Sequence, residues 1–217
     1  MDATTTGALN TAVGQDALGA NTTASNGTAV GYQALGANTT GGNNVAVGYQ
    51  ALDANTTGAA NTAIGYTALG ANTEADGGVA IGNRALDANT TGDYNVGIGH
   101  DALGANTTGT LNVAIGATAL DANTTANNNT AVGYAALGAN TTGDRNVAVG
   151  TSSADAITTG SRNVAIGYNS MTANTTGGRN VAVGHSALAT YNVTDSGDDY
   201  NTAIGYSALN ATTTGAN

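Results

Sequence analysis

The residues of this sequence that could carry out acid–base chemistry are few and scattered. His100 and His185 are its two histidines, and cysteine is absent. His100 stands beside Asp101, which is the minimum for a general acid–base pair. No phosphate-binding loop, second acid–base group or metal-ligand set recurs around either histidine. We therefore predict that the chain is not an enzyme and holds no cofactor.

Three tyrosines form a row with a constant spacing. Tyr32, Tyr49 and Tyr66 follow one another at equal intervals along the chain. Aromatic rings exposed in a row can bind the faces of sugars or pack against a partner chain. Alternatively, the rings cover a corner of the fold and stiffen it. The spacing leaves both interpretations open.

Three of the four arginines have the same spacing as these tyrosines. They are Arg145, Arg162 and Arg179, and Asp144 precedes the first of them. Because like charges held close together repel, such a row favours a bound anion, such as sulfate, an acidic glycan or a partner's carboxylate. The alternative is a solvated charged edge that Asp144 neutralises in part.

An acidic loop near the end of the sequence could bind calcium. Asp195, Asp198 and Asp199 lie in the segment 191–200, and carboxylate oxygens in a loop with glycine are the ligands that Ca²⁺ prefers. Their spacing matches no EF-hand loop. A plain surface loop is the alternative interpretation.

The tripeptide Asn-Thr-Thr is both a formal N-glycosylation acceptor and a turn-forming sequence. Rows of threonine also raise the possibility of an ice-binding surface. Thr56 and Thr57 are adjacent, however, and on a strand they would point in opposite directions, which is unfavourable for ice binding. The acceptor asparagines are Asn21, Asn38, Asn55, Asn89, Asn106, Asn123, Asn140 and Asn174.

All these residues are positioned by one 17-residue repeat. The glycine of each Ala-Val-Gly, Ala-Ile-Gly or Gly-Ile-Gly triplet recurs at this interval from Gly14 to Gly184, and the last, Gly205, comes after a four-residue insertion. We number the places of the repeat from 1 to 17, so that Asn44 is place 1, Gly48 is place 5 and Ala60 is place 17. The chain is thus one repeat domain over 1–217, with a partial coil at 1–9, regular coils over 10–188, an insertion at 189–200 and a last coil at 201–217.

A 17-residue repeat is too short for a pair of packed helices but suits one coil of a parallel β-solenoid. Residues such as 45–47 read as a short strand that ends at a glycine corner, and 55–58 as a second corner. The residues between these corners, such as 50–54, fit either a second strand or a single helical turn, and we favour an extended segment. Rows of asparagine at places 1 and 12 predict amide ladders along the stack. The fold class is therefore all-β, a solenoid of about twelve coils.

Comparison of the repeats predicts two core columns. Place 4 is always valine or isoleucine, and place 9 is nearly always leucine. Places 3, 8 and 11 are nearly always alanine, which indicates tight space. Place 2 alternates between valine and threonine, which is compatible with a boundary of the core or with a subunit contact. The predicted core residues include Val13, Val30, Val47, Ile64 and Ile81 at place 4 and Leu35, Leu52 and Leu69 at place 9.

Composition and charge restrict the partners. The chain has 217 residues, 33 of them glycine, with no proline, tryptophan or phenylalanine, and its formal net charge is −10. This charge argues against nucleic acid or an anionic membrane as partner. No apolar run approaches the roughly 18 residues that a membrane-spanning helix needs.

The Asn-Val-Ala-Ile-Gly segments at 112–116 and 163–167 resemble the head repeats of trimeric autotransporter adhesins. The full 17-residue form, as in 44–60, is still more similar to repeat arrays in bacteriophage tail fibres. The resemblance covers almost the whole chain. It implies a left-handed β-roll, a homotrimer and a location on a virion appendage or on a cell surface.

From these observations we expect a fibrous structural or adhesive protein, the shaft or the receptor-binding part of a viral tail fibre or surface appendage. Its partners would be further copies of itself, as a homotrimer or an end-to-end polymer, and a host-surface glycan. Two alternatives stay open, a self-assembling extracellular filament subunit and a glycan-binding or ice-binding surface protein.

Overall fold

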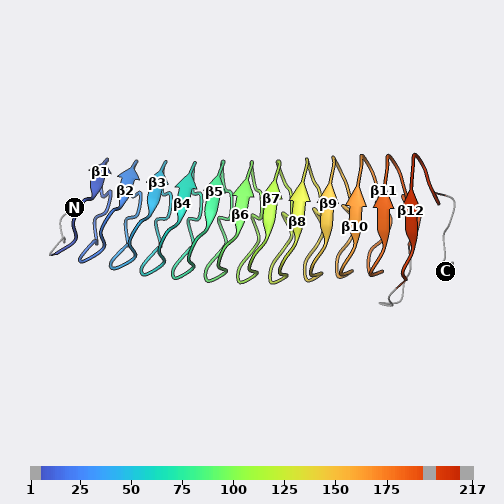
Figure 1. Ribbon diagram of the computed structural model, residues 1–217. Coiled ribbons are helices and arrows are strands. Elements are labelled where there is room, and N and C mark those ends of the chain that lie inside the picture. Colours follow the sequence, from blue (N-terminus) through green and yellow to red (C-terminus); the bar gives the residue numbers. More distant parts are fainter. Residues whose placement is uncertain (1–5, 193–198, 211–217) are drawn as a thin grey trace.

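Each repeat contributes one strand to a parallel sheet that runs the length of the molecule (Figure 1). The computed structural model describes residues 6–192 and 199–210, and within them twelve strands follow one another in chain order. They are β1 Thr11–Val13, β2 Thr28–Val30, β3 Val45–Val47, β4 Thr62–Ile64, β5 Val79–Ile81, β6 Val96–Ile98, β7 Val113–Ile115, β8 Thr130–Val132, β9 Val147–Val149, β10 Val164–Ile166, β11 Val181–Val183 and β12 Thr202–Ile204.

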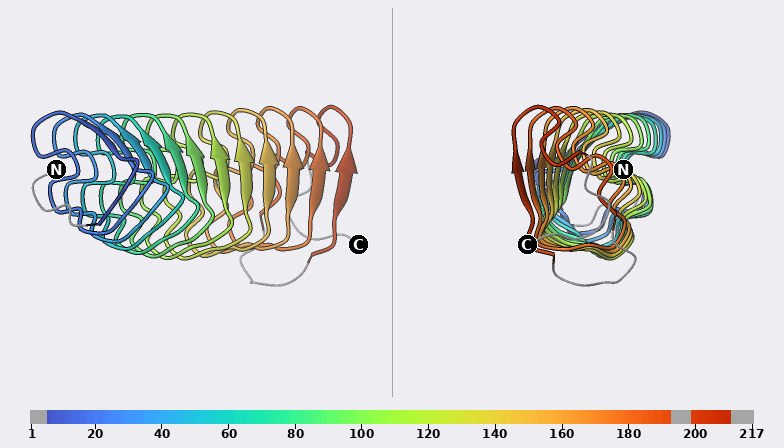
Figure 2. Two further views of the ribbon diagram at one scale, coloured as in Figure 1. Left: turned by 60° about the vertical axis from the view of Figure 1, so that its left-hand side comes forward. Right: turned by 90° about the vertical axis from the view of Figure 1, so that its right-hand side faces the viewer.

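The strands pair in register, so each place of the repeat lies beside the same place of the next coil. Between β3 and β4, for example, Ala46 pairs with Ala63. The register continues across the insertion, because Ala182 of β11 pairs with Ala203 of β12. Figure 2 shows the strands aligned on one side of the coils. The predicted β-solenoid is confirmed.

A glycine turns the chain at the end of every strand. Gly48 has φ of +140°, in a region that residues with a Cβ avoid. A Cβ added there would lie 2.2 Å from the carbonyl oxygen of Gly65 on the next coil. The predicted glycine corner is confirmed, and close stacking of the coils is the reason for it.

The segment between the two corners is a series of turns, and the interpretation of residues 50–54 as extended was wrong. Gln50 and Leu52 both adopt left-handed backbone conformations, with φ of 51°. Residues 49–54 form successive turns that direct the leucine side chain into the coil. A leucine with positive φ is unfavourable in isolation, and burial of its side chain offsets the cost.

The core is a column of leucines packed against columns of alanine. Leu35, Leu52 and Leu69 are buried, as predicted for place 9. Alanines at places 3 and 8, such as Ala46 and Ala51, are fully buried in the same cluster. Small side chains at these places let the coil close around the leucines.

The predicted core column at place 4 was wrong. Val13 is 58% exposed, Val30 36%, Ile64 39% and Ile81 37%, and Val47 is half-buried. Successive side chains of a strand point to opposite faces, and the alanine at place 3 faces the interior. Places 2 and 4 therefore share the outer face of the sheet.

Asparagines form the predicted ladders along the stack. At place 12, Asn55 donates from Nδ2 to Oδ1 of Asn38 at 2.8 Å, and Asn72 donates to Asn55 in the same way. At place 1, Oδ1 of Asn44 accepts the backbone N–H of Asn61 at 2.8 Å. These buried amides join neighbouring coils outside the strands, so they connect the corners of one coil to those of the next.

The place-12 ladder is not continuous along the rod. Ile157 and Tyr191, both fully buried, stand where the other described coils have asparagine. Oδ1 of Asn140, on the coil before Ile157, has no hydrogen-bond partner in the structure. The fold tolerates such breaks.

Candidate functional surfaces

The outer face of the sheet, defined as the side chains at places 2 and 4 of the strands, is an apolar surface. Only valine, isoleucine and threonine occupy these places in the twelve described strands. The place-4 side chains are partly exposed, for example Ile115 at 39% and Ile166 at 38%. Contiguous apolar surface of this kind marks an interaction site on soluble proteins. Sequence comparison predicted that place 2 lies at a boundary or a subunit contact, but it missed place 4 because that constant apolar place was interpreted as core.

The tyrosine row is a stack of rings. The rings of Tyr32 and Tyr49 have centroids 5.2 Å apart and planes inclined by 16°, and those of Tyr49 and Tyr66 are also 5.2 Å apart, inclined by 7°. Both faces of Tyr49 are thus covered by its neighbours. A sugar that binds by stacking needs a free ring face, so Tyr49 is poorly placed to bind one.

A second aromatic group lies near the other end of the rod, and sequence analysis did not predict that a histidine would lie between its two tyrosines. The imidazole of His185 lies between the rings of Tyr168 and Tyr206, with centroid separations of 5.2 and 4.9 Å. The three residues all occupy place 6, which was the available signal. Tyr134, at the same place, has no ring partner among the described residues and is 59% exposed.

The three arginines form a column along one edge of the coils. Their backbones share a left-handed conformation, with φ of 58° at Arg145, 61° at Arg162 and 59° at Arg179. Arg145 and Arg162 are exposed, and neither makes an ion pair with any of the described residues. Arg179 lies over the ring of Tyr200, 5.2 Å from its centroid, and donates to the tyrosine hydroxyl.

Asp144 does not neutralise this column through an ion pair. Its Oδ1 accepts the backbone N–H of Asn127 at 2.6 Å. Side chains at place 16 act in this way in several coils, and Ser161 accepts the backbone N–H of Asp144 at 3.0 Å. The side chain of Asp144 thus forms a hydrogen bond between neighbouring coils.

The fourth arginine is paired. Nε of Arg84 lies 3.1 Å from Oδ2 of Asp87 and 3.5 Å from Oδ1 of Asp101. Nδ1 of His100 lies 2.9 Å from the other oxygen of Asp101, in an exposed position. His100 and His185 occupy the same place on coils five repeats apart, so the structure does not bring the two histidines together.

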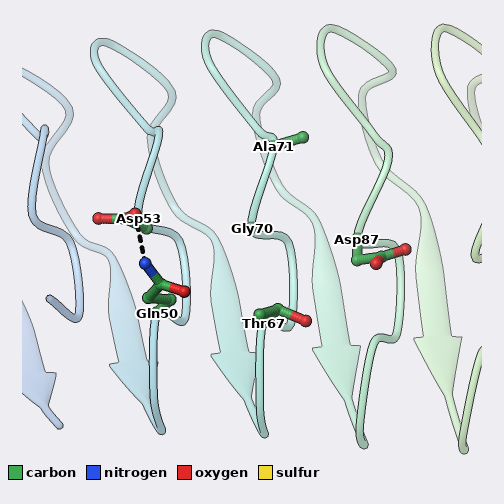
Figure 3. A pocket seen from close by; sticks show the side chains of 6 residues that line it. All are labelled: Gln50, Asp53, Thr67, Gly70, Ala71 and Asp87. Carbon is green, nitrogen blue, oxygen red and sulfur yellow. Dashed lines mark hydrogen bonds between the residues drawn. The ribbon is translucent and has the colours of Figure 1, made fainter. Parts of the chain in front are cut away.

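Aspartate and glycine alternate at place 10 from coil to coil along the middle of the rod. Gly70 lies between Asp53 and Asp87, and these residues with Gln50, Thr67 and Ala71 line a hollow of about 240 Å³ (Figure 3). The alternation makes room for the carboxylates.

A Cβ at Gly36 would lie 2.6 Å from Oδ1 of Asp53, and one at Gly104 would lie 2.9 Å from Oδ1 of Asp121. Burial raises the pKa of Asp53. It also raises the pKa of Asp121, where the neighbouring Asp101 carboxylate acts in the same direction.

The asparagines of the Asn-Thr-Thr turns are not presented as glycosylation acceptors. Asn55 and Asn106 are fully buried, and their amide nitrogens donate within the place-12 ladder. The first threonine also bonds internally, since Thr56 donates its hydroxyl to the carbonyl of Thr73. The folded coils therefore conceal these motifs.

The predicted calcium loop is only partly described. Asp195 and Asp198 lie outside the described residues. Asp199 accepts a hydrogen bond from Nδ2 of Asn180 at 3.2 Å. Within residues 6–192 and 199–210, no group of three or more His, Asp or Glu side chains is arranged to hold a metal ion.

Searches against known protein families, curated proteins and solved structures find no match for the chain. In the described part of the chain, no helix is long and apolar enough to cross a membrane. The surfaces themselves are therefore the basis for inferring function.

Proposed function

We propose that this chain is a non-enzymatic fibrous protein that forms the shaft or receptor-binding part of a viral tail fibre or a similar extracellular appendage. In this proposal three copies associate side by side through the outer face of the sheet. The observation that supports it is the apolar character of that face along all described strands. Stacked coils form a long rod in which each coil is held by its neighbours, and a shaft requires this shape.

The outer face has the chemistry of a subunit interface. Val149 and Ile166 each leave more than a third of their surface exposed, and no charged residue stands at places 2 or 4 of the described strands. Completing the burial of one such side chain is worth about 0.5–1 kcal/mol, a third of the full transfer value. Repeated along the rod, this contribution exceeds what a short patch could supply. Charged residues are depleted at the core of interfaces, as they are here.

The test is the mass of the purified chain by size-exclusion chromatography with light scattering, combined with negative-stain electron microscopy. We expect a discrete particle of three chain masses. Ile115→Lys places a charge on the outer face and should yield monomers. Thr125→Lys adds the same charge to an exposed turn of the same coil and should leave the trimer intact. A monomeric parent chain, or equal effects of the two substitutions, would refute association through this face.

A second candidate is a filament that grows end to end. Among the described strands, β1 pairs only with β2 and β12 only with β11, so each leaves one edge unpaired. Unpaired strand edges can recruit another chain. Polymers whose length rises with protein concentration, seen in the same measurements, would favour this candidate over the closed trimer.

A further inference from the structure

We infer that Arg145, Arg162 and Arg179 form a binding site for a linear anionic polysaccharide, one that carries sulfate or carboxylate groups along its length. We call these three residues the arginine column. The inference concerns the edge of the coils and does not depend on how the outer face of the sheet is used.

The first step is the exposure of two of the three arginines. Arg145 and Arg162 are exposed and make no ion pair with the described residues. Asp144, which precedes Arg145, accepts the Asn127 backbone N–H and makes no ion pair with either arginine. At the same place in the next two coils stand Ser161 and Gly178, which carry no charge.

The second step is the arrangement of the charges. The parallel register places equivalent residues of successive coils about 4.8 Å apart, so the three side chains originate at one edge in a line. The common left-handed backbone at place 17 gives them the same starting direction. Arg179 is further held against the ring of Tyr200. Guanidinium groups in this arrangement suit a series of sulfate or carboxylate groups, each bound by paired N–H donors.

The third step is the choice of partner. The chain carries a net charge of −10, and Asp76 and Asp93 lie at place 16 further along the same edge. A densely charged nucleic acid would extend beyond the three arginines and meet these acids. A short polysaccharide whose sulfate or carboxylate groups are spaced about one per coil can bind the arginine column without reaching these acids.

The test measures binding of the full chain to dextran sulfate at low salt, with uncharged dextran as the reference polymer. We expect binding to dextran sulfate only. Arg145→Gln with Arg162→Gln should weaken it about tenfold or more, and should reduce the slope of log affinity against log salt concentration by about 1.5.

The matched control changes the net charge by the same amount away from the arginine column. Arg84→Gln removes the charge of the paired arginine, and Thr57→Glu adds an acid at an exposed turn. Together these two substitutions lower the net charge by the same amount as the double arginine variant. This control should leave the affinity for dextran sulfate nearly unchanged.

Three binding results, and one change in mass, would overturn the inference. One is equal binding of dextran sulfate by the parent chain and the double arginine variant. The second is a loss in the control as large as in the double arginine variant, since this would show a response to net charge alone. The third is tighter binding of a short DNA duplex than of dextran sulfate. The mass of the double arginine variant is measured as well, because a change in oligomeric state would overturn the inference by assigning the arginine column to a second copy of the chain.

Discussion

Removing one amide from the place-12 ladder should destabilise the rod by a predictable amount. Asn106 donates from Nδ2 to Oδ1 of Asn89 at 2.7 Å and to the carbonyl of Gly109 at 3.0 Å, and its Oδ1 accepts from Asn123 at 2.7 Å. Asn106→Ala removes all three hydrogen bonds. Each is worth about 1 kcal/mol, and the buried Asn89 oxygen loses its donor from the ladder, so we expect a loss of about 3 kcal/mol.

The assay is urea denaturation followed by circular dichroism, with hydrogen exchange of the amides in the neighbouring coils. Thr108→Ala, at an exposed position of the same coil, is the control and should change the free energy of unfolding by less than about 0.5 kcal/mol. Exchange should accelerate most at Asn89 and Asn123, because each coil contacts only its neighbours. A loss for Asn106→Ala no larger than that for the control would refute the view that the ladder stabilises the stack.

Two further predictions concern charge and aromatic rings. The pKa of Asp121 is raised in the folded state, so folding favours the protonated form, and stability falls as pH rises from the unfolded pKa through the folded pKa. Asp121→Asn should therefore raise the urea midpoint at about pH 7, where the carboxylate of the parent is charged. The variant should lose this advantage near pH 3, where the carboxyl group of the parent is protonated. An equal effect at both pH values would contradict that reasoning. Tyr49→Ala should not reduce retention on a neutral polysaccharide column, since its ring faces are covered, whereas Tyr134→Ala should reduce any retention that the parent shows. A larger loss of retention for Tyr49→Ala than for Tyr134→Ala would indicate that the stacked rings bind the sugar.

The sequence was sufficient to predict the solenoid, the glycine corners, the leucine column and the amide ladders, because each depends on one residue type repeating at one place. The error at place 4 has a physical cause. A constant apolar residue is required equally by a core and by a surface that packs against another chain. The alternation of valine and threonine indicated a boundary or a subunit contact at place 2, and the same assignment holds for place 4 because places 2 and 4 of a strand share one face.

Two other features could not be read from residue types. The left-handed backbone of Leu52 is unusual for leucine, so propensity favoured an extended segment over the turns that form. The ring stack at Tyr49 depends on side-chain orientation, which spacing does not determine. The arginine column was predicted from spacing, but the commitment of Asp144 to the Asn127 backbone became visible only in the structure.

The alternation of glycine and aspartate at place 10 restricts how such a rod can change length during evolution. A repeat can be gained or lost without disrupting the packing only if the new contact between neighbouring coils resembles the existing ones. Inserting a single coil with aspartate at place 10 after Asp87 would place two carboxylates side by side. A single coil with glycine there makes a junction that the rod already has between Gly19 and Gly36, and a pair of coils preserves the order seen at Gly70, Asp87 and Gly104. In this part of the rod, a new coil that carries the carboxylate is therefore compatible with its neighbours only when a glycine coil accompanies it.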